Sequence, residues 1–480
     1  MKMGSLSVFW EVSSNPKPRK ESPFKMRRGK RTLPRRVNGD LRLQFGDEKL
    51  TSFAGLELLG RHSREIGLNQ RVRDAFSRVS WRGDYPFVSM LRLLLAMMLL
   101  GARRLRHVRY LSRDPMVLRF SGLRSIPEER TLARWLGRFD RRSLLALGQV
   151  SQDLVFDAIR RLKLKTLTLD LDGTVVSTGM QVEWAFRGFN PHHRKVPSYY
   201  PIVAHLAETG QILSVKNRPG NIHDGKRGVT FLRDLVLLIR SRLGRRVRLQ
   251  MRMDGAFFQR EVIETLIRSK VDYAIKVPMH QWLGLKPRIQ MRMRWNHVAP
   301  GISSFETVLP VSKWGLRLRV VCYRKKVFHP TAKNYQLDLF SPDDGVYEYS
   351  AVTTSLALDA KRLWFFMAGR GAQEKTLAEL KGGFAFDTIP TKRYAANSAW
   401  QWISVLAHNL HRDFQMTRGT ARRLRTSKVT YLFPFESIMT SRFEWLNVAG
   451  RLLNLAEGLT LRLPRSPEVE QRYRRWLRAA

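Results

Sequence analysis

The stretch Thr166-Leu-Thr-Leu-Asp-Leu-Asp172 alternates strictly between polar and apolar side chains. Its three leucines fall on one side of an extended chain, and its threonines and aspartates fall on the other. A period of two predicts a β-strand with one face against an apolar core. Two carboxylates, those of Asp170 and Asp172, are therefore expected on the polar face of this strand.

The segments that follow supply the rest of an α/β core. Their patterns predict strands over 200–206 and 211–216 joined at a hairpin, a helix over 226–243, a strand over 247–254, a helix over 260–269 and a strand over 271–277. The order is strand, strand, strand, helix, strand, helix, strand, which is that of the ribonuclease H-like fold. We therefore predict an α/β chain whose ribonuclease H-like mixed sheet forms a catalytic core over 160–278, completed by helices within 360–415.

The remaining chain divides by composition. Residues 1–45 are rich in Pro and Arg and predict a disordered basic arm, which either binds DNA or is a solvated tail. Helical spacing over 46–155 predicts a helical domain, and the basic stretch over 127–136 is a candidate DNA-reading helix that would make it a DNA-binding domain. Residues 279–359 predict a β-rich insertion subdomain, and 416–480 predict a basic, mostly helical C-terminal region.

The charge identifies the class of partner. The 480 residues include 86 Lys and Arg against 40 Asp and Glu, a formal net charge of +46. Charge of this size favours a nucleic acid, and its spread along the whole chain argues against a membrane partner. The single cysteine, Cys322, excludes an internal disulfide and fits a reducing compartment, so we expect a cytoplasmic protein without a signal peptide.

Three carboxylates are candidates for the chemistry. Asp172 and Asp254 each end a predicted strand and are followed by Gly, and open α/β sheets carry their sites at such strand ends. Either Asp-Gly pair could instead simply mark a turn. Glu374 shares a predicted helix face with Arg370 and Lys381, although surface ladders of salt bridges have the same spacing. Glu379, about half a turn away, is expected to be solvated.

Several motifs resemble those of the DDE transposases of bacterial insertion sequences, closest to the groups called Insertion Sequence Four and Thirteen-eighty. The motifs are Leu169-Asp-Leu-Asp-Gly-Thr174, Arg218-Pro-Gly-Asn221, Arg252-Met-Asp-Gly-Ala-Phe257 and Arg370-Gly-Ala-Gln-Glu-Lys-Thr-Leu-Ala-Glu-Leu-Lys381, followed by Asn397 and Leu406-Ala-His-Asn-Leu410. The resemblance extends from about Thr51 onwards. In those families a Tyr, Arg, Glu, Lys pattern surrounds the third carboxylate, and here Met367 stands at the Tyr position.

The resemblance implies a DNA-cutting and DNA-joining enzyme that uses two Mg²⁺ or Mn²⁺ ions. The implied metal ligands are Asp172, Asp254 and Glu374, with Asp170 as the alternative to Asp172. Arg370, Lys381 and Arg252 are expected to contact DNA. The implied partners are transposon terminal repeats and target DNA, bound by a homodimer at the bacterial nucleoid. The alternatives are a domesticated or inactive DNA-binding protein and another ribonuclease H-like nuclease.

Two other groups of residues are candidates for a functional role. The insertion carries Trp282, Trp295 and Trp314 near cations, which suits stacking on an unpaired base or packing of the insertion's own core. Related transposases stabilise a flipped base with such an insertion. The histidines have a spacing that matches no metal motif and are expected to be structural: His192, His193, His205 and His223.

Overall fold

The computed structural model describes residues 43–81, 83–179, 181–188, 195–222, 224–326, 347–419 and 431–478. The chain divides into two units, Met1–Glu48 and Lys49–Ala480. Only residues 43–48 of the first unit are described, and they form neither helix nor strand. The expected basic arm over 1–45 therefore lies almost entirely outside the described residues, and the folded elements all belong to the second unit.

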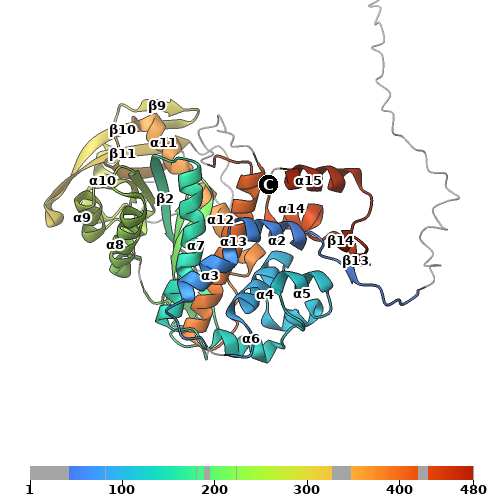
Figure 1. Cartoon of the computed structure of the whole chain (residues 1–480). Helices are drawn as coiled ribbons and strands as arrows, with labels where there is room; N and C mark the ends of the chain where they lie inside the picture. Colours follow the sequence, from blue (N-terminus) through green and yellow to red (C-terminus); the bar gives the residue numbers. More distant parts are fainter. Residues whose placement is uncertain are drawn as a thin grey trace, which may run out of the picture. The chain divides into compact units, whose positions relative to one another are not determined.

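A nine-stranded mixed sheet is the centre of the second unit, with the order β6-β5-β2-β7-β8-β12-β11-β10-β9 (Figure 1). The first five strands of that order are β6 (Gln211–Lys216), β5 (Ile202–Leu206), β2 (Thr166–Gly173), β7 (Arg248–Met253) and β8 (Asp272–Val277). Strands β2, β7 and β8 are mutually parallel, while β5 pairs antiparallel with both β2 and β6. All five predicted strands of the core are confirmed, as is the hairpin between β5 and β6.

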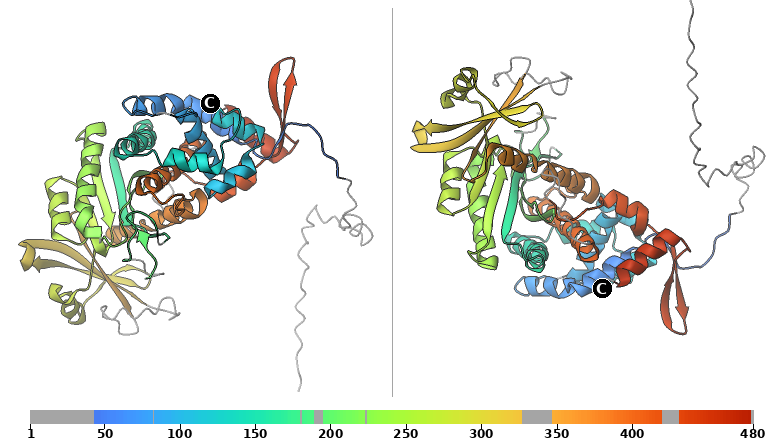
Figure 2. Two further views of the ribbon diagram at one scale, coloured as in Figure 1. Left: turned by 90° about the horizontal axis from the view of Figure 1, so that it is seen from below. Right: turned by 90° about the horizontal axis from the view of Figure 1, so that it is seen from above.

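The alternation of β2 decides which helices cover each face of the sheet. Its leucines pack in one cluster with α8 (Asp224–Leu243) and α9 (Arg260–Arg268). On the opposite face, Val203 of β5 and Ile212 of β6 pack with α12 (Gly371–Phe384) and α13 (Tyr394–Arg418). Figure 2 shows the green helices α8 and α9 on one side of the sheet and the orange α13 on the other. Asp170 and Asp172 therefore face the α12 side, as the period of two predicts.

The insertion extends this sheet and does not form a sheet of its own. Its strands are β9 (Asn296–Ala299), β10 (Ile302–Val311), β11 (Leu316–Lys326) and β12 (Tyr347–Thr354), with η3 (Gln281–Leu283), α10 (Leu285–Gln290) and η4 (Ser312–Trp314) between them. Strand β12 pairs antiparallel with β8, and this pair of strands connects the sheet of the insertion to the sheet of the core. Helix α11 (Ala360–Ala368) then leads to α12.

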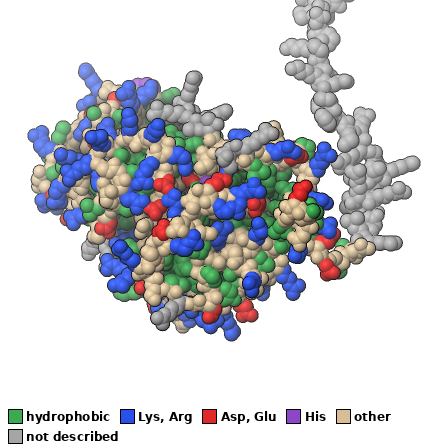
Figure 3. Space-filling view, in the orientation of Figure 1, with side chains coloured by type: hydrophobic (Ala, Val, Ile, Leu, Met, Phe, Trp, Pro, Cys, Tyr) green, Lys and Arg blue, Asp and Glu red, His purple; other side chains and the backbone are tan. Residues whose placement is uncertain are grey.

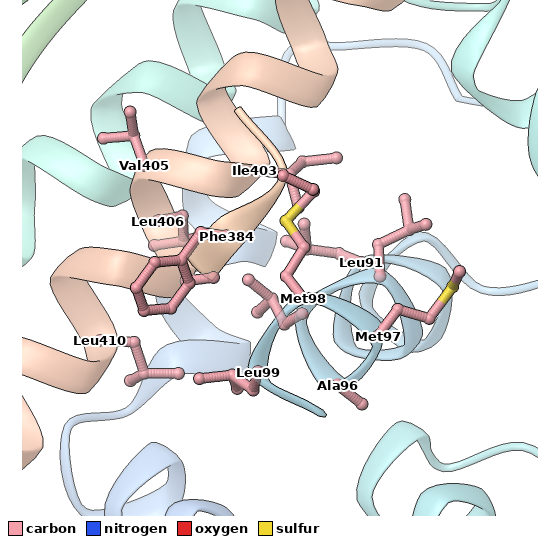
Figure 4. Packing of buried hydrophobic residues seen from close by; sticks show 14 of the residues in the cluster. Leu91, Ala96, Met97, Met98, Leu99, Phe384, Ile403, Val405, Leu406 and Leu410 are labelled. Carbon is pink, nitrogen blue, oxygen red and sulfur yellow. The ribbon is translucent and has the colours of Figure 1, made fainter. Parts of the chain in front are cut away.

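The N-terminal helical region shares its core with the C-terminal half of the chain. Its elements are α2 (Leu56–Glu65), α3 (Leu68–Phe76), α4 (Phe87–Leu100), η1 (Leu105–Leu111), α5 (Pro115–Ser121), α6 (Glu129–Leu136) and α7 (Arg141–Arg161). Figure 4 shows side chains of α4, such as Met98 and Leu99, beside Phe384 of α12 and Leu410 of α13. The predicted end of the helical domain at residue 155 falls inside α7. The helices before it share one hydrophobic core with α12 and α13.

The C-terminal region combines short helices with a hairpin. Its elements are α14 (Ile438–Ser441), the π-helix η5 (Arg442–Leu446), β13 (Gly450–Leu455), β14 (Gly458–Arg462) and α15 (Pro467–Arg478). Strand β1 (Leu50–Thr51) pairs with β13, so the beginning and the end of this unit meet in a three-stranded sheet. The expectation of a mostly helical region is thus incomplete.

Two further short strands, β3 (Val176–Ser177) and β4 (Ser198–Tyr199), pair beyond the end of β2.

Helix α4 contains the most apolar run of the chain and is 14 residues long. Nine of its residues are buried within the protein. Among the described residues, the structure has no helix with the length and apolar character needed to span a membrane.

Candidate active site at the ends of β2 and β7

Asp172 and Asp254 lie at the ends of two neighbouring parallel strands. The register pairs Leu171 of β2 with Met253 of β7, so Asp172 and Asp254 are the next residues along the two strands. Both side chains are half-buried. The carboxyl ends of parallel strands are where open α/β sheets bind ligands, because side chains there leave the sheet toward solvent.

The two Asp-Gly pairs have different structural roles. Gly173 is still within β2, and a Cβ atom there would lie 2.5 Å from the ring of Tyr200. This Gly is therefore required by the close approach of an aromatic ring and does not mark a turn. Asp254 does begin a turn, because its Oδ1 accepts a hydrogen bond from the Ala256 amide at 3.1 Å and caps the 3₁₀ helix η2 (Gly255–Phe257).

Asp170, the alternative to Asp172, is completely enclosed. Its carboxylate accepts bonds from Arg252 Nε at 2.5 Å and from Arg252 Nη2 at 2.8 Å, and His205 Nδ1 lies 3.1 Å away. Burial alone raises the pKa of Asp170, but Arg252 and His205 outweigh burial and bring that pKa below its usual value. Asp170 is thus a buried ion-pair partner, and Asp172 is the member of the pair that solvent reaches.

Arg252 does not occupy the place expected of a DNA contact. Its side chain is fully buried, and its third hydrogen bond goes from Nη1 to the carbonyl of Phe366 at 2.7 Å. A guanidinium held in this way has no surface to offer a phosphate. The expected DNA contact of Arg252 is therefore wrong for this structure, because its charge is paired inside the protein.

Helix α12 lies against the end of β2 through its predicted polar face. Arg370, the N-cap residue, donates from Nη2 to Asp172 Oδ2 at 2.6 Å. Lys381 donates to the carbonyl of Val175 at 3.0 Å. Burial lowers the pKa of Lys381, although Asp387 and Asp172 act in the opposite direction. Arg370 and Lys381 thus reach the neighbourhood of Asp172, as their shared helix face predicts.

Glu374 and Glu379 differ in their exposure to solvent. Glu374 is exposed and lies about 40° around the helix from Arg370. Glu379 forms an ion pair with Arg412, and its Oε1 accepts the Ile438 amide at 2.7 Å. The expectation that Glu379 is solvated is therefore wrong, because Arg412 of α13 and the first residue of α14 contact its carboxylate.

The fit of the site to divalent metal ions is partial. Asp172 and Asp254 supply the carboxylate oxygens that Mg²⁺ and Mn²⁺ prefer. Within the part of the chain that the structure describes, however, no group of three or more His, Cys, Asp or Glu side chains lies together closely enough to hold a metal ion. The structure thus brings the two aspartates to adjacent strand ends and leaves Glu374 outside a common cluster with them.

Residues around the first two turns of α12 form contacts that their local sequence pattern does not predict. His205 lies on β5, within the predicted strand over 200–206, and its fully buried ring faces Asp170. Gln373 and Thr376 of α12 and Tyr431 also make buried contacts here. The position of His205 within a predicted strand was the available signal. His192, His193 and His223 lie outside the described residues.

The tryptophans of the insertion have unequal surroundings. Trp282 is 46% exposed, and Lys313 Nζ lies 5.6 Å from the centre of its ring. Trp314 packs against Phe258, with ring centroids 4.9 Å apart. Trp295 packs edge-on against a phenylalanine and donates from its indole to a backbone carbonyl. Of the three, Trp282 presents the most open aromatic surface.

Positive charge is distributed widely over the described surface. Figure 3 shows Lys and Arg side chains across the whole face of the molecule in view, with Asp and Glu scattered between them. This distribution agrees with the net charge of +46 and suits contact with a polyanion over a broad area.

Comparison with known proteins places these features in a family. The family model described as "Transposase DDE domain group 1" matches residues 34–479. No curated protein matches the sequence. Among solved structures, a piggyBac transposase synaptic complex with hairpin DNA matches at 10% identity with a TM-score of 0.42, covering 82% of this chain and 80% of the other. A Mos1 transposase paired-end complex matches at 11% identity with a TM-score of 0.17, covering 40% and 60% respectively.

The family match spans nearly the whole chain, including both strands that end in a half-buried aspartate and the helix that carries Glu374. It thus covers the central sheet, the helices on both of its faces and the C-terminal region. The chain belongs to the family of transposase DDE domains, group 1.

Proposed function

We propose that this chain cuts DNA at the terminal inverted repeats of a mobile element and joins the freed ends to target DNA. The placement of Asp172 and Asp254 on neighbouring strand ends, beside the helix of Glu374, carries the proposal. Transfer of a phosphodiester requires charge to be neutralised on both the attacking and the leaving oxygen. The strand order β6-β5-β2-β7-β8 supports a ribonuclease H-like core as the scaffold.

We assign the metal ligands to Asp172, Asp254 and Glu374, for two Mg²⁺ or Mn²⁺ ions. Ions held by these carboxylates would supply activation of a water or a 3′-hydroxyl and neutralisation of the leaving oxygen. Arg370 orients the carboxylate of Asp172 through its 2.6 Å contact, and Lys381 anchors the segment beyond β2 at Val175. Both cations also bring positive charge near the place where DNA phosphates would lie.

The resemblance to the Insertion Sequence Four and Thirteen-eighty groups supports a bacterial insertion-sequence origin. On the same basis, we propose that the chain acts at the bacterial nucleoid and works as a homodimer when it holds two DNA ends. The DNA flanking the gene tests the origin, because inverted repeats on both sides are expected for a mobile element. Their absence would contradict it.

The proposed chemistry is tested with three variants, Asp172→Asn, Asp254→Asn and Glu374→Gln. Each should lose Mg²⁺-dependent cleavage of repeat-end DNA while keeping its affinity for that DNA, because a carboxamide is a poor ligand for Mg²⁺. Removal of divalent ions by chelation should have the same effect on the parental chain. Asp84→Asn and Glu457→Gln, at exposed positions far along the chain from these residues, are the matched controls and should cut normally. Cleavage at the parental rate by one of the three variants removes that residue from the site.

A domesticated DNA-binding protein is the second candidate. Met367, at the position of the family's Tyr, and the separation of Glu374 from the two aspartates favour it. In that case the parental chain binds repeat DNA, with an affinity that falls steeply with salt, but cuts no more than Asp172→Asn does. A ribonuclease H-like nuclease of another kind would cut without joining, so a strand-transfer assay on the same DNA separates all three functions.

A further inference from the structure

A network of buried polar side chains lies where α12 meets the central sheet. It joins Asp170 of β2, His205 of β5 and Arg252 of β7 to Thr376 of α12 and to Tyr431. We propose that this network positions the first two turns of α12 over the ends of β2 and β7, and thereby sets where Glu374 stands relative to Asp172 and Asp254. The inference rests on the proposed function, because it assigns positioning residues to that site.

The base of the network is a charged pair with a histidine beside it. Asp170, His205 and Arg252 are all fully buried. The carboxylate of Asp170 can only accept hydrogen bonds in its ionised form, so the Nδ1 atom of His205 carries the proton that it shares with Asp170. The Nε2 atom of a neutral His205 is then an acceptor, and it points to Thr376 Oγ1 at 3.3 Å. Burial lowers the pKa of His205 and favours this neutral form.

Further contacts of the network hold the first two turns of α12. The hydroxyl of Tyr431 lies 2.7 Å from Thr376 Oγ1 and 2.8 Å from the carbonyl oxygen of Ala372, so its single proton is shared between these two acceptors while the hydroxyl of Thr376 donates to His205 Nε2. Gln373 donates from Nε2 to the backbone carbonyl of Asp170 at 3.0 Å. These contacts involve residues 372, 373 and 376, so they flank Glu374 on both sides along the helix.

Arg252 also fixes the connection between α11 and α12. It donates to the carbonyl of Phe366, near the end of α11, while its other nitrogens hold Asp170. The corner between α11 and α12 is therefore tied to β7, and the first turns of α12 are tied to β2 and β5. Glu374 itself is exposed, so its position depends on these backbone and side-chain anchors and not on its own packing.

Stability alone is a poor explanation for such an arrangement. A buried ion pair is commonly no more stabilising than well-packed apolar side chains of similar volume, because both charges lose their hydration. What a directional network does supply is a fixed geometry, and an error of about 1 Å in the placement of a catalytic group can cost about a hundredfold in rate. The location of this network, at the contact between the two aspartate strands and the helix of Glu374, fits that purpose.

The test uses two conservative changes in the full-length protein, Thr376→Val and Tyr431→Phe. Each removes one hydroxyl and keeps the shape of the side chain. The matched controls are Thr353→Val, a buried threonine on β12 that donates to Arg319 O at 3.0 Å, and Tyr473→Phe, whose hydroxyl donates to Trp445 O at 2.8 Å. The measurements are the melting temperature, affinity for repeat-end DNA, the single-turnover cleavage rate at saturating DNA and Mg²⁺, and amide hydrogen exchange over residues 371–377.

The expected result separates positioning from stability. Thr376→Val and Tyr431→Phe should slow cleavage by about tenfold or more, as misplacement of a catalytic group predicts, with DNA affinity unchanged. Their melting temperatures should fall no further than those of the matched controls, which should cut at the parental rate. Thr376→Ser, which restores the hydroxyl, should recover most of the rate. A Thr376→Val protein that cuts as fast as Thr353→Val would overturn the inference.

Hydrogen exchange keeps this test independent of the proposed chemistry. If the parental chain does not cut DNA at all, the proposed function fails, and exchange alone then decides the inference. Faster exchange of residues 371–377 in Thr376→Val and Tyr431→Phe, but not in the two control variants, supports the network as the anchor of α12. Unchanged exchange in both variants refutes it.

Discussion

Replacing Arg252 by methionine should destabilise the fold severely. The substitution removes the bidentate partner of Asp170 and leaves that carboxylate buried beside His205 alone. Breaking a buried pair by removing one partner typically costs about 3–5 kcal/mol. The carbonyl of Phe366 also loses its donor, which adds to the loss. We therefore expect Arg252→Met to lower the free energy of unfolding by about 3–5 kcal/mol at pH 7.5.

Urea unfolding followed by tryptophan fluorescence measures this loss, with Arg248→Met as the control. Arg248 lies on the same strand and pairs with Asp272 at 2.7 Å, but its side chain is 57% exposed. Exposed pairs contribute about 0–1 kcal/mol, so the control should unfold close to the parental midpoint. Asp170→Leu combined with Arg252→Met removes both charges and should be less destabilised than the sum of the two single variants. Strictly additive losses, or a loss below about 1 kcal/mol for Arg252→Met, would refute the reasoning.

The pH dependence of Arg252→Met provides a second check. In the parental protein, Arg252 and His205 bring the pKa of Asp170 below its usual value despite burial. Without Arg252, burial dominates and that pKa rises above the value in the unfolded chain. The native variant then binds more protons than the unfolded chain, so its stability falls as pH rises through this range. The gap in stability between variant and parent should consequently narrow at pH 5.

Three further outcomes are expected. Burial holds the pKa values of His408 and His411 well below 6.5, so the unfolded chain binds their protons first and the melting temperature should fall as pH drops below 6.5; a constant melting temperature from pH 7.5 to 5 would contradict this. Gly173→Ala should lower stability by about 1–3 kcal/mol and slow cleavage, because its Cβ would meet a tyrosine ring at 2.5 Å; an unchanged urea midpoint would show that the ring moves freely. If the exposed ring of Trp282 stacks on an unpaired base, Trp282→Ala should stall second-strand cleavage and leave the melting temperature nearly unchanged. Trp314→Ala should mainly lower the melting temperature, because Trp314 packs against Phe258. Normal cleavage of both strands by Trp282→Ala would exclude the stacking role of Trp282.

The sequence was sufficient for the elements of the core because their periods are local properties. The alternation over 166–172 determines both the strand and the side of the sheet that each aspartate faces. The spacing of Arg370 and Lys381 likewise predicts that they share a helix face, and both contact the end of β2 or the segment just beyond it. In each case the prediction depends only on the spacing of residues within one strand or one helix.

The errors concern partners that are distant in sequence. The family resemblance implied a DNA contact for Arg252, but its partner Asp170 comes from another strand, 82 residues away. Glu379 looked solvated on a helical wheel, yet Arg412 of α13 reaches it. A wheel gives the angle between two side chains, but it does not show which other element packs against each of them. The core that the helical region shares with α13 could not be predicted for the same reason, because the two parts are far apart in the sequence.

The register between β2 and β7 connects the buried pair to the site. Asp170 and Arg252 are direct partners in the parallel ladder, and Asp172 and Asp254 follow two residues later on the same face. A shift of β7 by one residue would turn Arg252 away from Asp170. Its charge would then be buried on the other face of the sheet, among the apolar side chains that pack with the leucines of β2. The same shift would carry Asp254 to the opposite face from Asp172. The Asp170–Arg252 ion pair therefore disfavours the one-residue shift, and the observed register that pairs these two residues also places Asp172 and Asp254 side by side.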